Sequence, residues 1–498
     1  FAEPWHWNQA VMLRAAEALK WRALDAAVAE LVAHHDALRL RFTQAEDGTW
    51  RQHNEAATGH EDSSSSGSAT VHDGGTAAGR EDAARSDEGA GRADALVLRV
   101  DLSALADAQQ SRVQSRVAGE VQRSLHLETG PLVRVAVFIR SDGERVLVVT
   151  HHLVVDGVSW RILLEDLEAA YAQAVRGERI SLPAKTSSFQ QWAQRLERYG
   201  REPERMEELD YWLGEREGWG EEEVGRVELD HEKGENTVES ARVVVSELDE
   251  EETRALLQDV PGVYGTQIQE ALMTGLVGSL AKRMGRERWV IEMEGHGREE
   301  IFEEMDVTRT VGWFTTLYPV MIEVGGSWDA GKALKSVKEQ LRQVPGRGLG
   351  YGLWRYMNDG EKAEEGRGPK SGWPKAEISF NYLGQFDQTT HTTARFHPTT
   401  ESVGRNRSPS QRRTHLLDIG GSVEQGRLRM RWIFSEHYHR SETIEALAQE
   451  FVGELRRLIA HCQSADAGGY TPSDFTQVNL SQDELDELMA ELGELAGE

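Results

Sequence analysis

Two adjacent histidines, His151 and His152, stand where their side chains could transfer protons. They follow an apolar run at 145–150 that is typical of a strand, and a helical pattern of apolar residues comes next (Leu163, Leu167, Ala170 and Ala174). Histidine titrates near neutrality, and a strand end can hold an imidazole toward a cleft. Asp156 and then Gly157, which can take a positive φ, predict a tight loop with a polar anchor. The alternative is a structural turn in which one histidine is packed and the other is solvated.

A second pair, His34 and His35, offers a comparison within the same chain. It ends a helical pattern and is followed by Asp36, but no glycine follows this acid. We therefore interpret His34, His35 and Asp36 as a structural cap or a buried polar contact without chemistry. A metal ion held by the first histidine pair and Asp156 is the less favoured alternative there. Because no set of cysteines and histidines has zinc-finger spacing, we predict no metal.

A carboxylate takes a similar position in the second half of the chain. The run at 289–294 has large apolar residues at alternate positions, which predicts a half-buried strand that ends at Glu294. Gly295 and Gly297 follow directly. A histidine at one strand end and an acid at another, each from its own lobe, would form a two-sided acid/base site. Taken alone, Glu294 is also explained as a surface or salt-bridged acid.

Composition narrows the class of protein. A chain of 498 residues predicts about two to three domains or lobes. The formal net charge of -28 argues against nucleic acid as a partner, because phosphate binding needs a basic face. No run is long enough to span a membrane, and the single cysteine, Cys462, fits a reducing, cytoplasmic location. Because the first residue is Phe1, we expect a piece of a longer polypeptide with partner domains on it.

Changes in composition divide the chain into two lobes. A connector at 182–186 predicts an N-terminal lobe at 1–184 and a C-terminal lobe at 185–498, and helix and strand patterns alternate in both. Residues 54–93 are poor in large apolar side chains, which predicts a disordered insertion in a surface hairpin. The glycine-rich run at 345–352 lacks the residues of a phosphate-binding loop, so we interpret it as a flexible loop.

Four motifs in a fixed order resemble one enzyme family. They are HHLVVDGVSW (151–160), EGHGREE (294–300), TVGWFTTLYPV (310–320) and FNYLGQFD (380–387). Together they closely resemble the epimerization domains of nonribosomal peptide synthetases, from WHWNQAVML (5–13) to YTPSDF (470–475). The first motif alone indicates only the wider condensation-domain superfamily, whereas EGHGREE with FNYLGQFD indicates epimerization.

The resemblance implies a fold, a reaction and partners. The fold is α/β (α+β), with two lobes that resemble chloramphenicol acetyltransferase, arranged as a V around a central tunnel. An upstream peptidyl carrier domain would insert its 4'-phosphopantetheine arm, and the thioester-bound residue would be inverted at Cα from L to D. The domain itself would bind no cofactor, no nucleic acid and no membrane, and a condensation or docking domain would follow. Apart from the resemblance, the arginine-rich run at 405–413 is either a docking segment for an acidic partner or a solvated loop.

The resemblance also implies roles for four charged residues. His152 matches the second histidine of the family motif and Glu294 the glutamate opposite it, so these are the predicted catalytic residues. Asp156 and Arg298 are predicted to form a structural salt bridge across the lobes. A buried charge left without its partner would cost several kcal/mol.

Four further residues are predicted to support the site. His151 and Gly157 belong to the first motif and are expected to be structural. Asn381 and Tyr382 are expected to line the tunnel and to donate hydrogen bonds to the thioester carbonyl, which would stabilise the enolate.

Two other functions compete with epimerization. A condensation domain would use the same His152 to join an amine to a thioester, but EGHGREE and FNYLGQFD disfavour it. A non-catalytic domain that only recruits carrier domains or tailoring enzymes would be expected to have lost catalytic positions, whereas His152, Asp156, Gly157 and Glu294 are all present.

Overall fold

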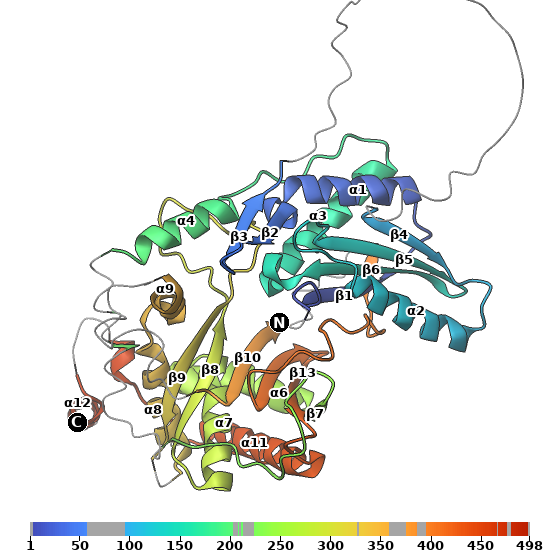
Figure 1. Cartoon of the computed structure of the whole chain (residues 1–498). Coiled ribbons are helices and arrows are strands. Elements are labelled where there is room, and N and C mark those ends of the chain that lie inside the picture. Colours follow the sequence, from blue (N-terminus) through green and yellow to red (C-terminus); the bar gives the residue numbers. More distant parts are fainter. Residues whose placement is uncertain are drawn as a thin grey trace, which may run out of the picture.

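Two mixed sheets packed against helices form the two lobes of the computed structural model (Figure 1). The structure describes residues 3–56, 95–202, 208, 211–212, 224–325, 328–357, 375–385, 395–465, 467–475 and 480–496. No helix within these ranges is long and apolar enough to cross a lipid bilayer. The sheet that contains the histidine strand and its helices are called the first lobe, and the other sheet with its helices the second lobe.

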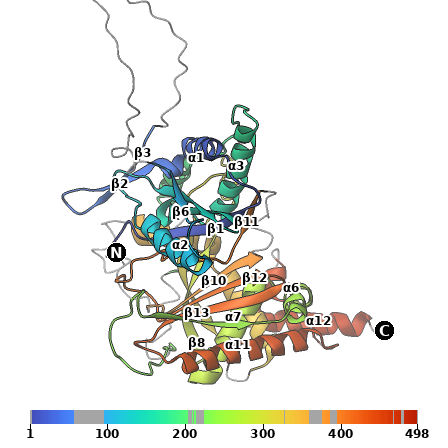
Figure 2. The ribbon, with the colours of Figure 1, turned by 90° about the vertical axis from the view of Figure 1, so that its right-hand side faces the viewer.

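The first lobe is a five-stranded sheet with helices on both faces. Its elements are β1 (Asn8–Ala15), α1 (Trp21–His34), β4 (Val97–Asp101), α2 (Asp107–Gln122), β5 (Val133–Arg140), β6 (Gly143–His151), α3 (Gly157–Val175) and β11 (Phe396–Pro398). The strand order is β11-β1-β6-β5-β4, with β4 and β5 parallel and the other neighbours antiparallel. Helices α1 and α3 pack on one face and α2 on the other (Figure 2).

The hairpin of β5 and β6 carries the first histidine pair at its end. On β6, Val146 and Val148 pack with the core under α1 and α3, while Leu147 and Val149 pack with α2. A strand buried on both faces needs apolar residues at consecutive positions, which explains the apolar run at 145–150. The predicted strand is confirmed, and so is the helix predicted after it, which is α3.

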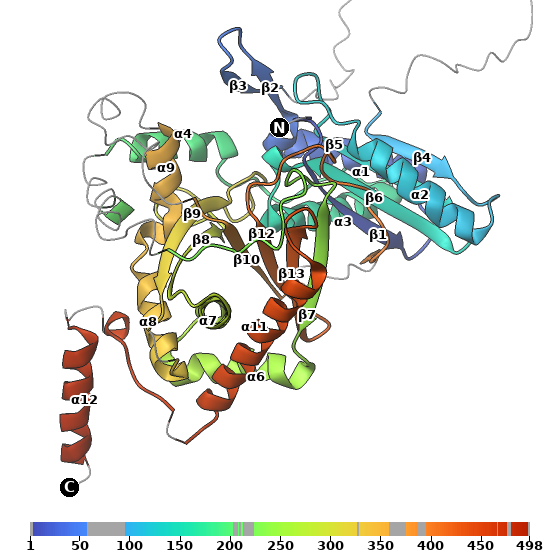
Figure 3. The ribbon, with the colours of Figure 1, turned by 60° about the horizontal axis from the view of Figure 1, so that its bottom comes forward.

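The second lobe is a six-stranded sheet with helices packed on one face (Figure 3). Its elements are β7 (Ala241–Glu247), α6 (Glu250–Tyr264), α7 (Ile268–Met284), β8 (Arg288–Gly295), β9 (Thr316–Glu323), α8 (Ala330–Arg342), β10 (Ile378–Gln385), β12 (Leu417–Glu424), β13 (Arg427–Ser435) and α11 (Ser441–Cys462). The strand order is β7-β13-β12-β10-β8-β9, and β10 runs parallel to both of its neighbours.

The strand that carries Glu294 has an apolar and a polar face. Trp289, Ile291 and Met293 of β8 belong to the core under the helices. Because side chains alternate along a strand, Glu292 and Glu294 leave β8 on the opposite face. The predicted half-buried strand is confirmed, and its free face is available for a site.

Two segments of the chain's second half reach the first lobe. Strand β11 pairs with β1, so a strand from far along the chain completes the first sheet. The loop at 296–315, between β8 and β9, contacts α3 and the segment before α4 (Phe189–Tyr199). The division at 184/185 stays a prediction. By sequence β11 falls in the predicted C-terminal lobe, whereas its pairing with β1 places it in the first sheet.

Two loop predictions have different outcomes. The hairpin β2 (Leu40–Gln44) and β3 (Trp50–Asn54) is present, but most of the predicted insertion at 54–93 lies outside the described residues. The glycine-rich run at 345–352, which was interpreted as a flexible loop, instead has helical secondary structure. It forms a 3-10 turn (Pro345–Gly348) and the start of α9 (Leu349–Met357), because Gly348, at a φ of 82°, lets the backbone lie directly against an aromatic ring.

Gly297 allows the first turn of the loop at 296–315. It has a φ of 66°, and an added Cβ would lie 1.7 Å from the carbonyl oxygen of Phe314. Gly285 has almost the same φ, 65°, but open space around it. We expect Gly285→Ala to lower the free energy of unfolding by about 1 kcal/mol, from the left-handed φ alone. Gly297→Ala should lower it by at least about 2 to 3 kcal/mol, because the backbone contact adds to that strain. Equal losses for both variants in denaturant titrations would contradict the steric cause.

Candidate active site

The loop after β6 places the histidines and the acid at the start of α3. His152–Val154 form one 3-10 turn, and Asp156 is the N-cap of α3, where its Oδ1 accepts a hydrogen bond from the Ser159 N–H at 2.7 Å. Such a carboxylate satisfies a free amide and lies favourably in the helix dipole. Gly157 opens the helix without a positive φ, so the conformation predicted for this glycine is wrong.

His151 is completely buried and held by two hydrogen bonds. Its Nε2 donates to the Pro4 carbonyl at 2.8 Å, and its Nδ1 accepts from the Leu153 N–H at 3.2 Å. Burial lowers the pKa of His151 to about 4, so the ring is neutral. These contacts fit the structural role predicted for it.

His152 lies among aromatic rings and contacts an amide that was not predicted from the sequence. Trp7 stacks on its ring at 4.5 Å and Trp313 meets it edge-on at 5.3 Å. The Trp160 indole N–H donates to Gln9 Oε1 at 2.6 Å. This bond turns the Gln9 amide nitrogen toward His152 Nε2, at 3.0 Å. An amide nitrogen can only donate, so Nε2 accepts and the ring proton is on Nδ1.

Burial sets the protonation state of His152. Desolvation lowers its pKa to about 4, the positive charge of Arg407 acts in the same direction, and Asp156 opposes it. At neutral pH the imidazole is therefore neutral, with its lone pair on Nε2. The ring is in the form that a general base requires.

Glu294 is shifted in the opposite direction by the same cause. Burial raises its pKa to about 7, Arg407 opposes that shift, and the negative charges of Glu292 and Asp418 support it. The Asn381 amide nitrogen donates to Glu294 Oε2 at 2.5 Å. Near neutral pH the carboxyl group therefore populates both protonation states, which is the condition for accepting and donating a proton.

A buried ion network lies beside Glu294. His415 bridges Glu292 at 3.1 Å and Asp418 at 3.2 Å, and Arg413 contacts Asp418 at 2.7 Å. Burial opposes protonation of His415, but its bonds to Asp418 and Glu292 outweigh burial and raise its pKa to about 9. Burial likewise opposes ionisation of Asp418, yet His415 and Arg413 hold its pKa well below the usual range. The network therefore pairs two carboxylates with two cations beside Glu294.

The predicted ion pair between Asp156 and Arg298 is present. Arg298 Nη2 lies 3.1 and 3.2 Å from the two carboxylate oxygens, and the side chains are only 4% and 7% exposed. Arg298 Nη1 donates to the carbonyls of Val307 and Thr310 at 2.9 and 2.8 Å. The Phe314 N–H donates to Asp156 Oδ2 at 3.1 Å, and the Phe314 ring lies under the guanidinium at 3.9 Å. The pair thus fixes the loop at 296–315 to the start of α3.

Asn381 and Tyr382 do not lie together. They are consecutive on β10, so their side chains leave opposite faces of the sheet. Asn381 reaches Glu294, whereas Tyr382 packs against the core of the second lobe, and burial raises its pKa to about 12. The structure brings one of the two residues to the site, and a role for Tyr382 at a thioester stays a prediction.

Four side chains at the site were not predicted from the sequence: Trp7, Gln9, Trp313 and Arg407. Trp7 lies just before β1 and Gln9 on it, Trp313 lies in the loop at 296–315, and Arg407 lies in the run at 405–413. In the sequence, these residues are marked only by lying in the family motifs or in the arginine-rich run. A lone glutamine or tryptophan has no spacing that indicates a role in chemistry. Tertiary contact, not local pattern, brings them to the histidine.

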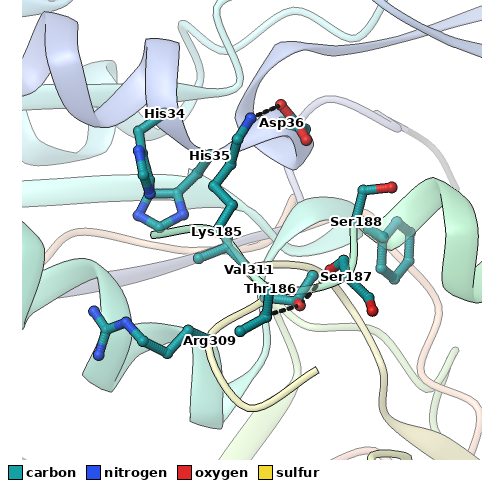
Figure 4. A pocket seen from close by; sticks show the side chains of 11 residues that line it. His34, His35, Asp36, Lys185, Thr186, Ser187, Ser188, Arg309 and Val311 are labelled. Atoms are coloured by element: carbon teal, nitrogen blue, oxygen red, sulfur yellow. Dashed lines mark hydrogen bonds and ion pairs between the residues drawn. The ribbon is translucent and has the colours of Figure 1, made fainter. Parts of the chain in front are cut away.

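Figure 4 shows a small pocket at the other histidine pair, where α1, the connector at 185–189 and the loop at 309–311 meet. His35 Nε2 lies 3.0 Å from Asp166 Oδ2, and Arg309 donates to Asp166 Oδ1 at 2.6 Å. Asp36 instead pairs with Lys185 at 3.1 Å. The buried polar contact predicted for this pair is therefore present at His35.

One group of possible metal ligands occurs in the part of the chain that the structure describes: His34, His35 and Asp166. The predicted alternative set around His152 does not form such a group there. Arg309 already occupies one oxygen of Asp166, and a cation at that position disfavours a second cation.

A family model agrees with this geometry. The model of the condensation domain matches residues 1–64 and 93–481. The chain belongs to the condensation-domain family. The internal residues that the match omits, 65–92, lie inside the insertion predicted at 54–93.

Several nonribosomal peptide synthetases contain a stretch similar to this condensation-family chain. A linear gramicidin synthase protein from Brevibacillus parabrevis is 41% identical over 487 residues, which is 97% of this chain and 8% of that protein. Gramicidin S synthase 1 from Brevibacillus brevis is 34% identical over 496 residues, 98% of this chain and 41% of that protein. The chain therefore spans less than half the length of these relatives.

Solved structures of condensation-family domains share the fold. The epimerization domain from the third module of tyrocidine synthetase B is 33% identical, with a TM-score of 0.79 over 92% of this chain and 94% of that one. The first condensation domain of the CDA synthetase is 17% identical, with a TM-score of 0.64 over 93% of both chains, and shows the fold alone. The predicted α/β (α+β) fold with two lobes that resemble chloramphenicol acetyltransferase is confirmed. Domains of this family carry no cofactor of their own and receive the substrate on the phosphopantetheine of a carrier domain.

The ion pair of Asp156 and Arg298 should show strong energetic coupling. Arg298→Met leaves a buried carboxylate without its cation, and we expect a loss of about 3 to 5 kcal/mol in the free energy of unfolding. The double variant Asp156→Asn/Arg298→Met should lose less than the sum of the single variants, with coupling of about 1 to 3 kcal/mol in urea titrations. The half-exposed pair Arg176–Glu178 is the control, where Arg176→Met should cost less than about 1 kcal/mol. Additive losses at the buried pair would contradict the geometry.

The raised pKa of Glu294 should make its replacement pH-dependent. The pKa is about 7 in the folded chain, against an ordinary value of 4.5. As pH rises between these values, the Glu294 carboxyl group ionises in the unfolded chain while it is still protonated in the folded chain. The free energy of unfolding of the wild type therefore falls, and it stops falling above the pKa of the folded chain. Relative to the wild type, Glu294→Gln should gain up to about 3 kcal/mol from about pH 4.5 to about pH 8. A difference in unfolding free energy that does not change with pH would contradict the shift.

Proposed function

We propose that this condensation-family domain epimerizes the Cα of an aminoacyl or peptidyl residue held as a thioester on a carrier domain. One observation carries the proposal. A neutral imidazole and a carboxyl group with a pKa of about 7 come from opposite lobes, and the positive charge of Arg407 acts to lower the pKa of both. Inversion at Cα requires proton removal from one face and proton delivery to the other. The similarity to the tyrocidine synthetase epimerization domain supports the same reaction.

The two groups suit the two halves of such a reaction. Removing the Cα proton leaves negative charge on the thioester oxygen. Glu294 populates both protonation states near neutral pH, so it can take a proton in one direction and return it in the other. His152 begins neutral with its Nε2 lone pair free of a proton, and nearby enolate charge would stabilise the imidazolium that forms. The proposal assigns one face of Cα to each group.

The partners follow from the relatives. Because those proteins are much longer than this chain, we propose an upstream peptidyl carrier domain as the donor of the thioester and a condensation or docking domain downstream. The final peptide and the residue that is inverted depend on those domains.

A condensation reaction is the alternative, because the family also contains condensation domains. Such a reaction needs His152 beside an incoming amine, and it assigns no proton-transfer role to Glu294. Carrier-bound donor and acceptor supplied together would form an amide in that case, without deuterium entering Cα.

Replacing His152 should stop proton exchange at Cα. We expect His152→Ala to lose deuterium incorporation from heavy water into residues loaded on a carrier domain, with the fold intact, because the ring acts in the chemistry. His34→Ala, in the other histidine pair, is the control and should exchange like the wild type. Exchange near the wild-type rate in His152→Ala would refute the assignment, and no exchange by the wild type with carriers bearing each proteinogenic residue would refute the function.

Replacing Glu294 should separate the two faces of Cα. Glu294→Gln keeps the shape and an oxygen acceptor but cannot hold a titrating proton. We expect it to exchange label from only one of the two enantiomers, supplied separately as L- and D-loaded carriers, and to interconvert neither. Equal and undiminished racemisation from both would exclude Glu294 from the reaction.

A further inference from the structure

Arg407 lies beside the proton-transfer groups, although it comes from the arginine-rich run far along the chain. Its backbone forms an antiparallel bridge with Trp7, the residue whose ring stacks on His152. Two backbone hydrogen bonds flank this bridge, Asn8 N–H to the Asn406 carbonyl at 2.8 Å and Ser408 N–H to the His6 carbonyl at 3.1 Å. The backbone of Arg407 is thus paired with the residue whose ring stacks on the imidazole.

The guanidinium of Arg407 acts on both lobes. Its charge lowers the pKa of His152 and opposes the raised pKa of Glu294. Desolvation lowers the pKa of Arg407 itself, while Asp418 and Glu294 act to raise it. Arg407 is exposed to solvent, and the protein atoms around its guanidinium account for the desolvation. Arginine remains a cation at physiological pH, so the site holds a permanent positive charge.

This cation has no partner of its own within the described ranges, where its side chain makes no hydrogen bond and no ion pair. The carboxylates that it affects are engaged by other groups. Asp418 accepts from Arg413 and Ser379, and Glu294 accepts from Asn381. Asn381, which was predicted to contact the thioester oxygen, uses one of its two N–H donors at Glu294. A fork of N–H donors near the reacting groups is suited to an anionic oxygen.

We infer that Arg407 donates a hydrogen bond to the thioester carbonyl oxygen and stabilises the negative charge that forms there. The inference rests on the proposed epimerization. When a base takes the Cα proton, the electron pair of the C–H bond forms a double bond to the thioester carbon, and the carbonyl π pair moves to the oxygen. The guanidinium keeps its protons throughout. Reprotonation at Cα returns both electron pairs, so no atom is lost and no oxidant is needed.

The test measures the kcat and KM of Cα deuterium exchange with peptidyl carrier domain loaded with L-phenylalanine, L-leucine or L-valine. Arg407→Met should reduce kcat by about 100- to 1000-fold, as expected for one lost oxyanion donor, with little change in KM for the carrier. Arg407→Lys keeps the charge but not the fork and should retain more kcat than Arg407→Met. Arg412→Met is the matched control, because Arg412 pairs with exposed Glu235 and should leave kcat unchanged.

Two further readouts separate this role from a structural one. Adding guanidinium ion to Arg407→Ala at non-denaturing concentration should restore part of kcat, which a purely structural arginine would not permit. The kcat–pH profile of Arg407→Met should shift to higher pH, because His152 and Glu294 lose a nearby cation while Asp418 and Arg413 remain. A kcat within about twofold of wild type in Arg407→Met, or a rise in KM alone, would overturn the inference. If the wild type exchanges deuterium and Arg407→Met is unaffected, only the role of Arg407 is refuted. If the wild type shows no exchange, the proposed function itself is refuted.

Discussion

The buried ion pair between Asp156 and Arg298 fixes the geometry on which the site depends. Asp156 follows His152 by four residues on one loop, and Arg298 follows Glu294 by four residues on the other. One contact therefore sets His152 and Glu294 relative to each other. Its value lies in position more than in stability, because an apolar pair of similar volume can be as stable as a buried ion pair. The loop at 296–315 adds hydrogen bonds from the N–H groups of Gly312 and Phe314 to side chains at the start of α3.

Burial then determines the chemistry of both groups. Desolvation favours the neutral form of any titratable side chain, so it lowers the pKa of His152 and raises that of Glu294. In the proposed reaction, both shifts would let the two groups exchange protons near neutral pH. The network of Glu292, His415 and Asp418 keeps its own charges paired, and its negative members add to the shift at Glu294. Arg407 opposes that shift, so the pKa of Glu294 stays at about 7 and the carboxyl group is not locked in its protonated form.

The parts of the fold that the sequence predicted have local causes. The strand before His151, the helix after Asp156 and the strand ending at Glu294 follow from apolar periodicity, and the ion pair followed from motif resemblance. The positive φ expected at Gly157 and the flexible loop expected at 345–352 were wrong, because Gly157 begins a helix capped by Asp156 and the run at 345–352 forms a 3-10 turn and the start of α9. Gln9 and Arg407 could not be predicted as site residues, because Gln9 reaches His152 through the pairing of β1 with β6 and Arg407 through a backbone bridge to Trp7, about 400 residues away. The pairing of Asn381 with Glu294 likewise depends on the parallel register of β10 and β8.

The amides of Gln9 and Asn381 explain how such buried groups can remain both ordered and reactive. A buried polar atom without a partner costs about 1 to 3 kcal/mol, and here each proton-transfer atom has one neutral amide donor. A neutral donor satisfies the lone pair without changing the charge of the site, and it can be displaced when a carbon-bound proton approaches. Trp160 holds the Gln9 amide in the orientation that keeps His152 Nε2 as an acceptor, so the structure already contains the tautomer that the proposed proton removal requires. In the proposed reaction, this arrangement would lower the reorganisation required when the proton is transferred, which is the physical meaning of a preorganised site.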